Sequence, residues 1–223
     1  MLKGPVLYAA GTQDVFAGGE NPAFCADMPP YKRQAVANFR ADADKALSVT
    51  AHRLLCYAIK QVWGITPQSA DWDKLPNGKP FLKGQPDKHF NLSHSGAVAV
   101  CVLDDFPVGV DVQIQQQGKA RVAKRIMSAA EWAQMEKSED PEQFFFQVWA
   151  LKESYLKYTG EGISVPLGEI SVYPVRNKIL HNRNEYCVFT LLNDITGYQT
   201  AVCARGPLAA PLCWVAGKDL WPE

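Results

Sequence analysis

The stretch FFFQVWALKESYLKYTGEGI, residues 144–163, decides how the chain folds, because it places charged side chains inside an apolar helical segment. At about 3.6 residues per turn, large apolar side chains recur on one side of this helix: Phe144, Val148, Leu151, Tyr155 and Tyr158. The other side combines Phe146 and Trp149 with Glu153 and Lys157. A helix that is apolar nearly all round is usually buried, which predicts that Glu153 and Lys157 lie away from freely solvated surface. The alternative is an ordinary i,i+4 surface pair, worth only about 0.3–0.5 kcal/mol.

The segment PVGVDVQ, residues 107–113, contains a second anomaly, because aspartate is uncommon inside a β-strand. The period of two gives this strand one face of three valines and an opposite face of Gly109, Asp111 and Gln113. Glycine beside the aspartate predicts that another element approaches the strand closely. An edge or turn position for Asp111 is the alternative.

Together the helix and the strand indicate a site for phosphoryl-type chemistry. Asp111 and Glu153 would supply two carboxylate oxygens, with Gln113 as a neutral third ligand or a holder of water. Magnesium prefers one or two protein carboxylates, several waters and phosphate oxygens of a substrate. Lys157, one turn after Glu153, would reach the same phosphates, as in enzymes where metal and cations neutralise charge on a leaving phosphate.

The segment NLSHSG, residues 91–96, is expected to place a loop from Ser93 to Gly96 near that strand. Its hydroxyls, the His94 imidazole and backbone N–H groups suit phosphate oxygens. A core position for His94, bonded to a backbone carbonyl, is the alternative. The sequence has no G-x-x-x-x-G-K-[ST], no G-x-G-x-x-G before a helix and no G-x-S-x-G, so it favours neither a standard nucleotide cradle nor a nucleophile elbow.

Composition excludes several classes of function. The 23 Lys plus Arg residues balance 23 Asp plus Glu residues, which indicates neither a nucleic-acid nor a membrane partner. No apolar run approaches the roughly 18 residues of a membrane span, and the N-terminal run is too short for a signal peptide, so we expect a cytoplasmic location. The six cysteines form no C-x-x-C pair, and Cys101 and Cys203 lie in strand-like runs, as buried reduced thiols do.

The expected elements follow the order strand, helix, strands, helix, helix, strands. A helical region is expected to start near Tyr31 and, after ADADK, to continue over SVTAHRLLCYAIKQVWG, with Ser48 as a candidate N-cap and Gly64 at its end. Another helix is expected over residues 120–137. This order predicts an α+β protein of two halves, residues 1–104 and 105–223, the second carrying the metal site.

With these motifs, the chain resembles the 4′-phosphopantetheinyl transferases of the surfactin-synthetase-activating (Sfp) type. The two signatures of that family correspond to VGVDVQ and VWALKESYLK, and the resemblance extends to NGKP at 77–80, AHR at 51–53, FNLSHSG, RIMSAAEW and GYQTAVCA. The resemblance implies a monomeric α+β pseudo-dimer of two similar halves that binds coenzyme A and Mg²⁺ between them. It further implies a holo-[acyl-carrier-protein] synthase, which moves phosphopantetheine from coenzyme A to a serine of an apo acyl or peptidyl carrier protein and releases adenosine 3′,5′-bisphosphate.

The resemblance also implies a role for individual residues. Asp111, Glu153 and Gln113 would hold the metal, with Gln113 standing where many members have glutamate. Glu153 would also be the base for the serine, Lys157 would steady the pyrophosphate, and Glu131 would assist the base. The residues implied to hold coenzyme A are Lys32, Arg53, Gly78, Lys79, Pro80, Ser93, His94, Lys152 and Lys157.

Some alternatives stay open at the level of the sequence. Arg33 could replace Lys32 at coenzyme A, and the acceptor could be a fatty-acid, polyketide or nonribosomal-peptide carrier. A catalytically inactive module that binds coenzyme A or a carrier protein is a second reading, against which the intact set of acidic and basic residues argues. A metal-dependent nuclease of the D…(D/E)-x-K type is a third, although Lys157 follows Glu153 at i+4 instead of i+2.

Overall fold

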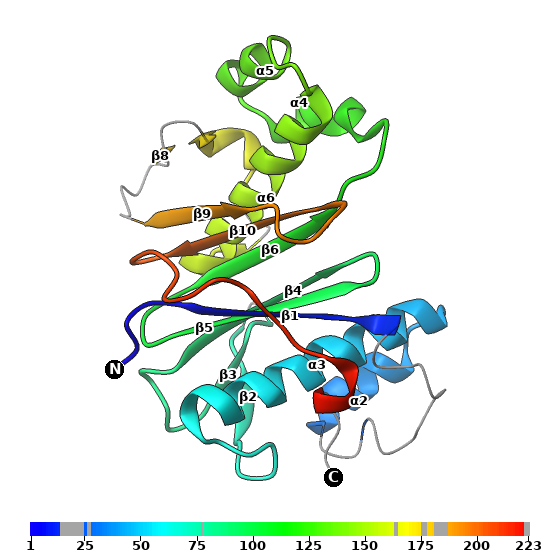
Figure 1. Cartoon of the computed structure of the whole chain (residues 1–223), viewed down its shortest axis with the longest axis vertical. Coiled ribbons are helices and arrows are strands. Elements are labelled where there is room, and N and C mark those ends of the chain that lie inside the picture. The colour runs from blue at the N-terminus through cyan, green and yellow to red at the C-terminus, as the bar shows by residue number, and fades with distance from the viewer. Residues whose placement is uncertain are drawn as a thin grey trace.

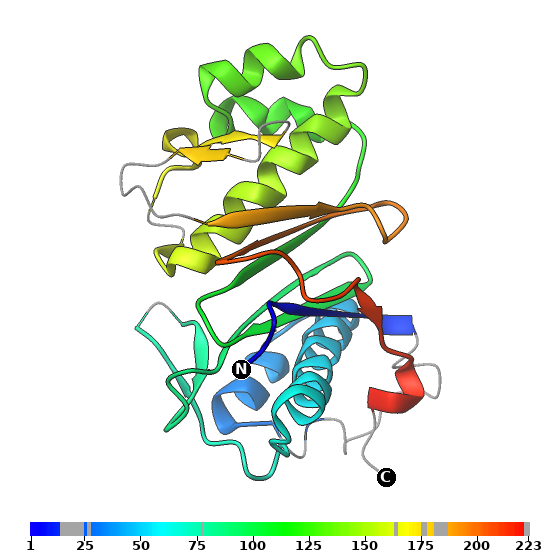
Figure 2. The same ribbon diagram turned by 60° about the vertical axis from the view of Figure 1, so that its left-hand side comes forward.

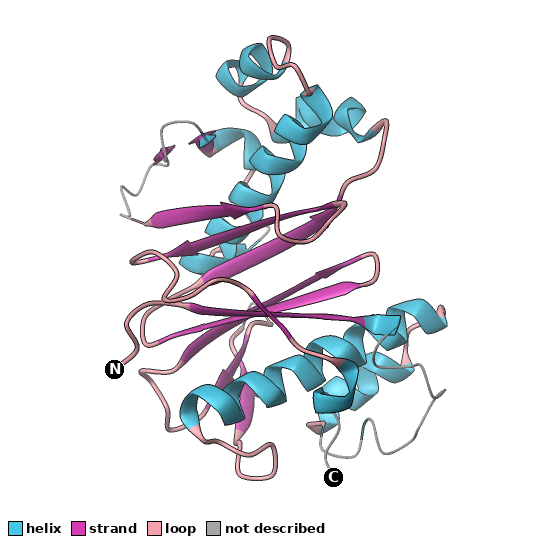
Figure 3. Ribbon diagram, in the orientation of Figure 1, coloured by secondary structure: helices cyan, strands magenta, loops and turns pink. Residues whose placement is uncertain are grey.

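The computed structural model describes residues 1–13, 25, 28–76, 78–162, 165–174, 178–180 and 187–220. Two β-sheets face each other across the middle of the molecule, and a long helix lies on the outer side of each (Figure 1; Figure 3). Figure 2 shows these two helices on opposite sides of the paired sheets. The mixture of helices and mainly antiparallel sheets confirms the α+β prediction.

The N-terminal half contains a four-stranded sheet in the order β11-β1-β5-β4. Its elements are β1 (Val6–Gly11), α2 (Pro30–Ala37), α3 (Asp42–Trp63), β2 (Trp72–Lys74), β3 (Pro80–Leu82), β4 (His89–Ser95), β5 (Val98–Asp104), β11 (Cys213–Trp214) and η6 (Gly217–Leu220). Because β11 pairs with β1 in parallel, the end of the chain joins the sheet of the first half, although it belongs to the predicted range 105–223.

Helix α3 begins earlier than the sequence pattern predicts. Ser48, the expected N-cap, lies inside the helix and is 2% exposed. The helix starts instead at Asp42, and the carboxylates of Asp42 and Asp44 in its first turn favour that start through the helix dipole. Gly64 ends the helix at φ 68°, as expected for a left-handed C-terminal cap.

The C-terminal half contains a three-stranded antiparallel sheet in the order β6-β10-β9. Its elements are β6 (Gly109–Ile114), η2 (Lys119–Val122), α4 (Ala123–Ile126), α5 (Ala129–Met135), α6 (Pro141–Thr159), η4 (Leu167–Glu169), β7 (Ser171–Tyr173), β8 (Lys178–Leu180), β9 (Val188–Leu192) and β10 (Tyr198–Ala204). The expected single helix over residues 120–137 is therefore broken, because Ser128 starts α5 with a capping box that it forms with Glu131.

Helix α6 contains most of the decisive stretch and is buried nearly all round, as predicted. The Asp140 side chain accepts a hydrogen bond from the Gln143 N–H and caps the first turn, and Gly160 ends the helix at φ 76°. Glu153 and Lys157 are half-buried, so they do not form an ordinary surface pair. Ile163, the last residue of the stretch, lies outside the described residues.

Strand β4 extends through Ser95, so the predicted loop at Ser93–Gly96 is wrong except for its last residue. The β4–β5 turn lies at Gly96, whose φ of +57° favours glycine. A β-carbon there would lie 2.7 Å from the Tyr198 hydroxyl and 2.8 Å from Ile114, so glycine also allows the hairpin to contact the other half.

The two halves share a hydrophobic core between their sheets. Its buried members come from both halves: Leu7, Ala9, Val98, Val100, Val102, Val108, Val110, Val112, Val202 and Ala204. Each sheet also packs against its own helix through a separate core. Among the described helices, none combines the length and apolar character that a bilayer-crossing segment requires.

Candidate active site

Strand β6 presents Asp111 to helix α6, as its alternating pattern predicts. The valines of β6 face the other sheet, whereas Gly109, Asp111 and Gln113 alternate with them. A β-carbon on Gly109 would lie 2.1 Å from the Ser154 carbonyl oxygen and 2.4 Å from the Tyr158 nitrogen. Glycine is therefore required at this position because the backbone of α6 crosses β6 in direct contact.

Asp111 is 2% exposed and accepts three side-chain hydrogen bonds. Its Oδ1 accepts from Lys157 Nζ at 2.7 Å and from the Ser93 hydroxyl at 2.8 Å, and its Oδ2 accepts from the Gln113 amide nitrogen at 2.8 Å. These bonds join β4, β6 and α6 at one carboxylate. The structure thus brings Asp111, Lys157, Ser93 and Gln113 together.

Glu153 lies close enough to Asp111 for the two carboxylates to influence each other. Burial raises the pKa of Glu153, the negative charge of Asp111 raises it further, and Lys157 lowers it. Within the described residues, no three or more His, Cys, Asp or Glu side chains gather as metal ligands. Two neighbouring carboxylates nevertheless fit Mg²⁺, which takes its other ligands from water and phosphate. Gln113 would join them only if its amide turned its oxygen toward the ion.

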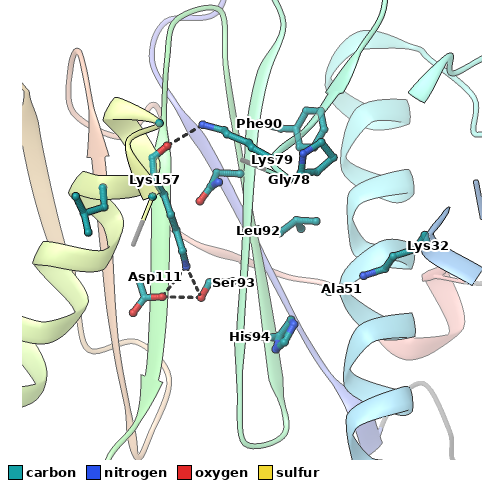
Figure 4. A pocket seen from close by; sticks show the side chains of 15 residues that line it. Lys32, Ala51, Gly78, Lys79, Phe90, Leu92, Ser93, His94, Asp111 and Lys157 are labelled. Carbon is teal, nitrogen blue, oxygen red and sulfur yellow. Dashed lines mark hydrogen bonds and ion pairs between the residues drawn. The ribbon is translucent and has the colours of Figure 1, made fainter. Parts of the chain in front are cut away.

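A cavity of about 550 Å³ opens beside Asp111, between the two halves (Figure 4). Four basic side chains from separate segments line it: Lys32 from α2, Lys79 from the segment before β3, His94 from β4 and Lys157 from α6. Figure 4 shows Lys157 and Asp111 on one side and Lys32 on the opposite side. The predicted Gly78, Pro80 and Ser93 also line the cavity, whereas Arg33 is exposed and does not.

Burial and neighbouring positive charges lower the pKa values of three basic side chains of the cavity. Burial, and then the charge of Lys74, lowers the pKa of Lys32. Burial, and then Lys157, lowers the pKa of Lys79 to about 8. Burial lowers the pKa of His94, with Lys32 and Lys157 contributing in the same direction. A bound polyanion would offset this crowding of positive charge, so the cavity favours a ligand with several phosphates.

Ser93 has a different position from the one expected of a phosphate ligand. Its hydroxyl donates its single proton to Asp111, and the oxygen accepts from Lys157 Nζ at 3.0 Å and from the Val112 N–H at 3.3 Å. One donor and two acceptor sites are the full capacity of a hydroxyl. Donation from Ser93 to a phosphate would therefore require its bond to Asp111 to open.

Lys152 and Glu131, expected at coenzyme A and beside the base, do not line the cavity. Both side chains are 0% exposed, and they form an ion pair of 2.6 Å with each other. The same Oε2 of Glu131 that pairs with Lys152 also accepts from the Ser128 N–H, and its Oε1 accepts from the Val172 N–H. This placement disagrees with both predicted roles, because a closed pair on the far side of α6 cannot contact a ligand in the cavity.

Arg53, which the resemblance implies at coenzyme A, does not line the main cavity either. It is 2% exposed and lines a separate cavity of about 180 Å³, whereas Ala51 on the same helix faces the main cavity. Arg53 therefore does not line the main cavity with Lys32 and His94, because Arg53 and Ala51 point in different directions from α3. Asn77, the first residue of NGKP, lies outside the described residues.

Sequence reasoning missed several residues that line the cavity, namely Ala51, Phe90, Asn91, Leu92, Leu156, Gly160 and Gly162. Of these, Asn91 carried a usable signal. The alternation N-x-S-x-S over residues 91–95 places three polar side chains on one face of a strand. A period of two is typical of a strand. Because Ser93–Gly96 was predicted as a loop, this alternation was not recognised as a continuation of the strand.

Similarity to known proteins agrees with this arrangement. Residues 107–203 match the sequence model of the 4′-phosphopantetheinyl transferase superfamily. A 4′-phosphopantetheinyl transferase of Bacillus subtilis is 28% identical over 207 residues, covering 90% of this chain and 92% of its own. The transferase Sfp of Bacillus subtilis (strain 168) is 29% identical over 194 residues, covering 84% and 87% of the two chains. The transferase psf-1 of Bacillus pumilus is 32% identical over 185 residues, covering 80% and 79%.

The similarity includes the residues that form the candidate site. Asp111, Gln113, Glu153 and Lys157 all lie within the range 107–203. The likeness to psf-1 covers 80% of this chain and 79% of psf-1, so it extends well beyond residues 107–203. The family expected from the sequence motifs is confirmed, and the chain belongs to the 4′-phosphopantetheinyl transferase superfamily of transferase enzymes.

Proposed function

We propose that the protein transfers the 4′-phosphopantetheine group of coenzyme A to a serine hydroxyl of an apo acyl or peptidyl carrier protein. The reaction depends on Mg²⁺ and releases adenosine 3′,5′-bisphosphate. One observation carries the proposal: in a chain with a formal net charge of zero, Lys32, Lys79, His94 and Lys157 converge on one cavity beside the Asp111 carboxylate. Coenzyme A carries a diphosphate and a 3′-phosphate, which match this local excess of positive charge.

The positions of the cations suggest how coenzyme A lies in the cavity. Lys157 contacts Asp111 and suits the diphosphate, where the reaction takes place. Lys32 lies across the cavity from that pair and, with His94, suits the 3′-phosphate (Figure 4). Gly78 and Pro80 line the same cavity and suit the adenine ring. A charge-assisted hydrogen bond to phosphate contributes about 1.5–3 kcal/mol.

Asp111 and Glu153 would hold the magnesium ion, with Gln113 or a water molecule as a further ligand. When bound, the ion neutralises negative charge that develops on the diphosphate. Burial raises the pKa of Glu153, the negative charge of Asp111 raises it further, and a bound cation would offset this repulsion between the carboxylates.

The transfer forms a bond between the serine oxygen and the phosphorus nearer to pantetheine. The bond from that phosphorus to the bridging oxygen of the diphosphate breaks, and adenosine 3′,5′-bisphosphate leaves. Glu153 accepts the proton of the serine hydroxyl, and its raised pKa favours proton acceptance. Lys157 stabilises the charge on the leaving bisphosphate from its position beside Asp111.

The site requires one chain only. Lys32, Lys79 and His94 come from the N-terminal half, and Asp111 and Lys157 come from the C-terminal half. Since both halves belong to the same polypeptide, we propose that the protein acts as a monomer.

The proposal is tested by incubating the protein with coenzyme A, Mg²⁺ and a panel of apo carrier proteins from fatty-acid, polyketide and nonribosomal-peptide pathways. Intact-mass spectrometry should record the addition of one phosphopantetheine to a carrier, together with an equal amount of adenosine 3′,5′-bisphosphate. Chelation of Mg²⁺ and replacement of the acceptor serine by alanine should each abolish the mass increase.

Two results would contradict the proposal in distinguishable ways. Binding of coenzyme A with no mass increase on any carrier would identify an inactive binding module. Cleavage of DNA or RNA that depends on Mg²⁺ and on Asp111, without transfer to a carrier, would identify a nuclease.

A further inference from the structure

Strand β6 pairs with β10 along one edge, and β4 lies along its other edge in a different sheet. Three β4 side chains accept hydrogen bonds from alternate N–H groups of β6: Asn91 Oδ1 from Val110 at 3.0 Å, Ser93 Oγ from Val112 at 3.3 Å and Ser95 Oγ from Ile114 at 3.0 Å. These six residues are called the polar seam below. In the seam, side chains of β4 replace the backbone partner that a further strand would provide.

The seam explains the alternating sequence of β4. Successive side chains of a strand point to opposite faces, so Asn91, Ser93 and Ser95 share one face. The outward N–H groups of β6 also recur every second residue. The two periods match, so the register of β4 sets the position of β6 along the boundary between the halves.

Asn91 holds strand β6 at Val110, the residue directly before Asp111. It is 8% exposed and lines the main cavity. Its carboxamide oxygen fixes the N–H of Val110, and the carbonyl of Val110 accepts a hydrogen bond from Lys157 Nζ at 3.1 Å. Val110 directly precedes Asp111, so its peptide groups connect Asn91 with both members of the Lys157–Asp111 pair.

We propose that Asn91 is a positioning residue for phosphopantetheinyl transfer, an inference that rests on the function proposed above. Through the Val110 N–H, Asn91 sets the place of β6 against β4, and thereby the place of Asp111 and Lys157 in the cavity. Displacement of a reacting group by about 1 Å can lower a rate by about 100-fold, so a single hydrogen bond at this position affects turnover.

Ser95 provides a matched control within the same seam. It accepts the same kind of hydrogen bond from a β6 N–H, but at Ile114, three residues beyond Asp111. Ser95 does not line the main cavity. Ser93 is unsuitable as a control because it contacts Asp111 and Lys157 directly.

The experiment compares Asn91→Leu, which keeps the size of the side chain but removes the acceptor, with Ser95→Ala. Amide hydrogen exchange in the ligand-free protein should show faster exchange of Val110 in the first variant and of Ile114 in the second. With a carrier protein in excess, Asn91→Leu should lower kcat by about 10- to 100-fold with less than about a threefold change in KM for coenzyme A. Ser95→Ala should change kcat by less than about twofold.

Asn91→Asp is the conservative variant, because its carboxylate keeps an acceptor oxygen, and it should restore slow exchange of the Val110 amide. If Asn91→Leu fails to fold, Asn91→Ala allows the same comparison with a smaller side chain.

Three outcomes would overturn the inference. A rise in KM for coenzyme A with unchanged kcat would make Asn91 a ligand contact. Equal losses of kcat in the Asn91 and Ser95 variants would make the seam only structural. Unchanged exchange of Val110 would show that Asn91 does not hold β6. Absence of transfer by the unaltered protein would refute the proposed function instead, and the exchange data would still decide whether Asn91 fixes β6.

Discussion

Helix α6 carries two lysines that each pair with a carboxylate, and the two pairs differ in their access to solvent. The Lys157–Asp111 pair spans 2.7 Å, with the lysine side chain 27% exposed and the aspartate 3% exposed. It opens into the main cavity. The Lys152–Glu131 pair spans 2.6 Å, and both of its side chains are 0% exposed. One helix therefore contributes an open pair to the cavity and a closed pair to the core.

The ammonium groups of both lysines donate to three partners inside the protein, so the pairs differ in access and not in the number of hydrogen bonds. Lys152 donates to Glu131 and to the carbonyl oxygens of Ile126 and Leu167, so its three protons all have partners inside the protein. These hydrogen bonds connect α4 and η4 to α6. Lys157 donates to Ser93, to the carbonyl oxygen of Val110 and to Asp111, but its side chain is partly exposed and lines the cavity. Access, more than the presence of a pair, distinguishes a ligand site from a structural contact.

Replacement of Lys152 by methionine should have the largest effect on stability. It leaves the Glu131 carboxylate buried without its cation, and breaking one side of a buried ion pair costs about 3–5 kcal/mol. Urea unfolding should show that loss in the free energy of unfolding. The kcat per folded molecule should remain close to that of the unaltered protein.

The double variant Lys152→Met/Glu131→Gln is the control, because it leaves no uncompensated charge and should recover part of the lost stability. If Lys152→Met lowered kcat while stability was unchanged, the Lys152–Glu131 pair would have a role in the reaction. That result would contradict its assignment as a structural pair.

Replacement of Asp111 by asparagine should have the largest effect on activity. It removes one of two neighbouring carboxylates and the charge partner of Lys157. Loss of one well-placed electrostatic group lowers kcat by about 10²–10³-fold. Glu153→Gln should lose at least as much, since Glu153 is both a proposed metal ligand and the proposed base. Steady-state kinetics and thermal unfolding, measured together, separate this loss from misfolding.

Asp104→Asn is the matched control, because Asp104 is also a buried strand aspartate, 3% exposed, and its side chain accepts from the Asp105 N–H away from the cavity. It should keep normal kcat. Near-normal turnover by Glu153→Gln would refute both roles proposed for Glu153.

Local periodicity in the sequence predicted much of the fold. The apolar spacing of α6 and the alternation of β6 both agree with the structure, because each depends on side-chain direction within one element. The start of α3 and the length of β4 were wrong. Ser48 is a good cap by residue type, yet the acidic residues at Asp42 and Asp44 extend the helix. Ser93 belongs to a strand because the pairing of β4 with β5 continues as far as Ser95, which lies opposite Val98.

The candidate site was predicted in part. Asp111, Lys157, Lys79 and Lys32 meet at the cavity as the motifs indicate. Lys152 does not, because one position along a helix turns a side chain by about 100°, and only tertiary packing decides which direction faces the cavity. Asn91 was missed for a related reason: its function depends on a neighbouring strand edge.

The ionisation of Lys79 should have a moderate effect on coenzyme A binding. Its ammonium group donates to the Lys157 carbonyl oxygen at 2.7 Å, and burial lowers its pKa to about 8. As the pH rises from 7 to 9, Lys79 loses its charge, so affinity for the phosphates should fall. Because pH 9 lies about one unit above this pKa, about nine-tenths of the Lys79 side chains are neutral there, and Kd should rise by up to about tenfold. Calorimetric titration at both pH values measures the change.

Lys79→Met should bind weakly at both pH values and lose most of this pH dependence. Lys83→Met is the matched control, because Lys83 is 50% exposed, pairs with Asp73 and does not line the main cavity. It should keep the pH dependence of the unaltered protein. If the affinity of Lys79→Met for coenzyme A still fell between pH 7 and pH 9, another titratable group of the main cavity would be responsible.

Replacement of Gln113 by glutamate should have the smallest effect. It tests whether position 113, next to the Lys157–Asp111 pair, takes part in binding Mg²⁺. The Gln113 amide now donates to Asp111 at 2.8 Å, and a glutamate would turn that contact into repulsion between carboxylates. Magnesium would relieve the repulsion, so the Mg²⁺ concentration for half-maximal activity should fall by about three- to tenfold. Thermal unfolding should also show a larger Mg²⁺-dependent rise in Tm for Gln113→Glu. The matched control is Gln116→Glu, which adds the same charge at an exposed position just after β6. If Gln113→Glu and Gln116→Glu lowered the Mg²⁺ concentration for half-maximal activity equally, added negative charge near β6 would explain the effect, and position 113 would not contact the ion.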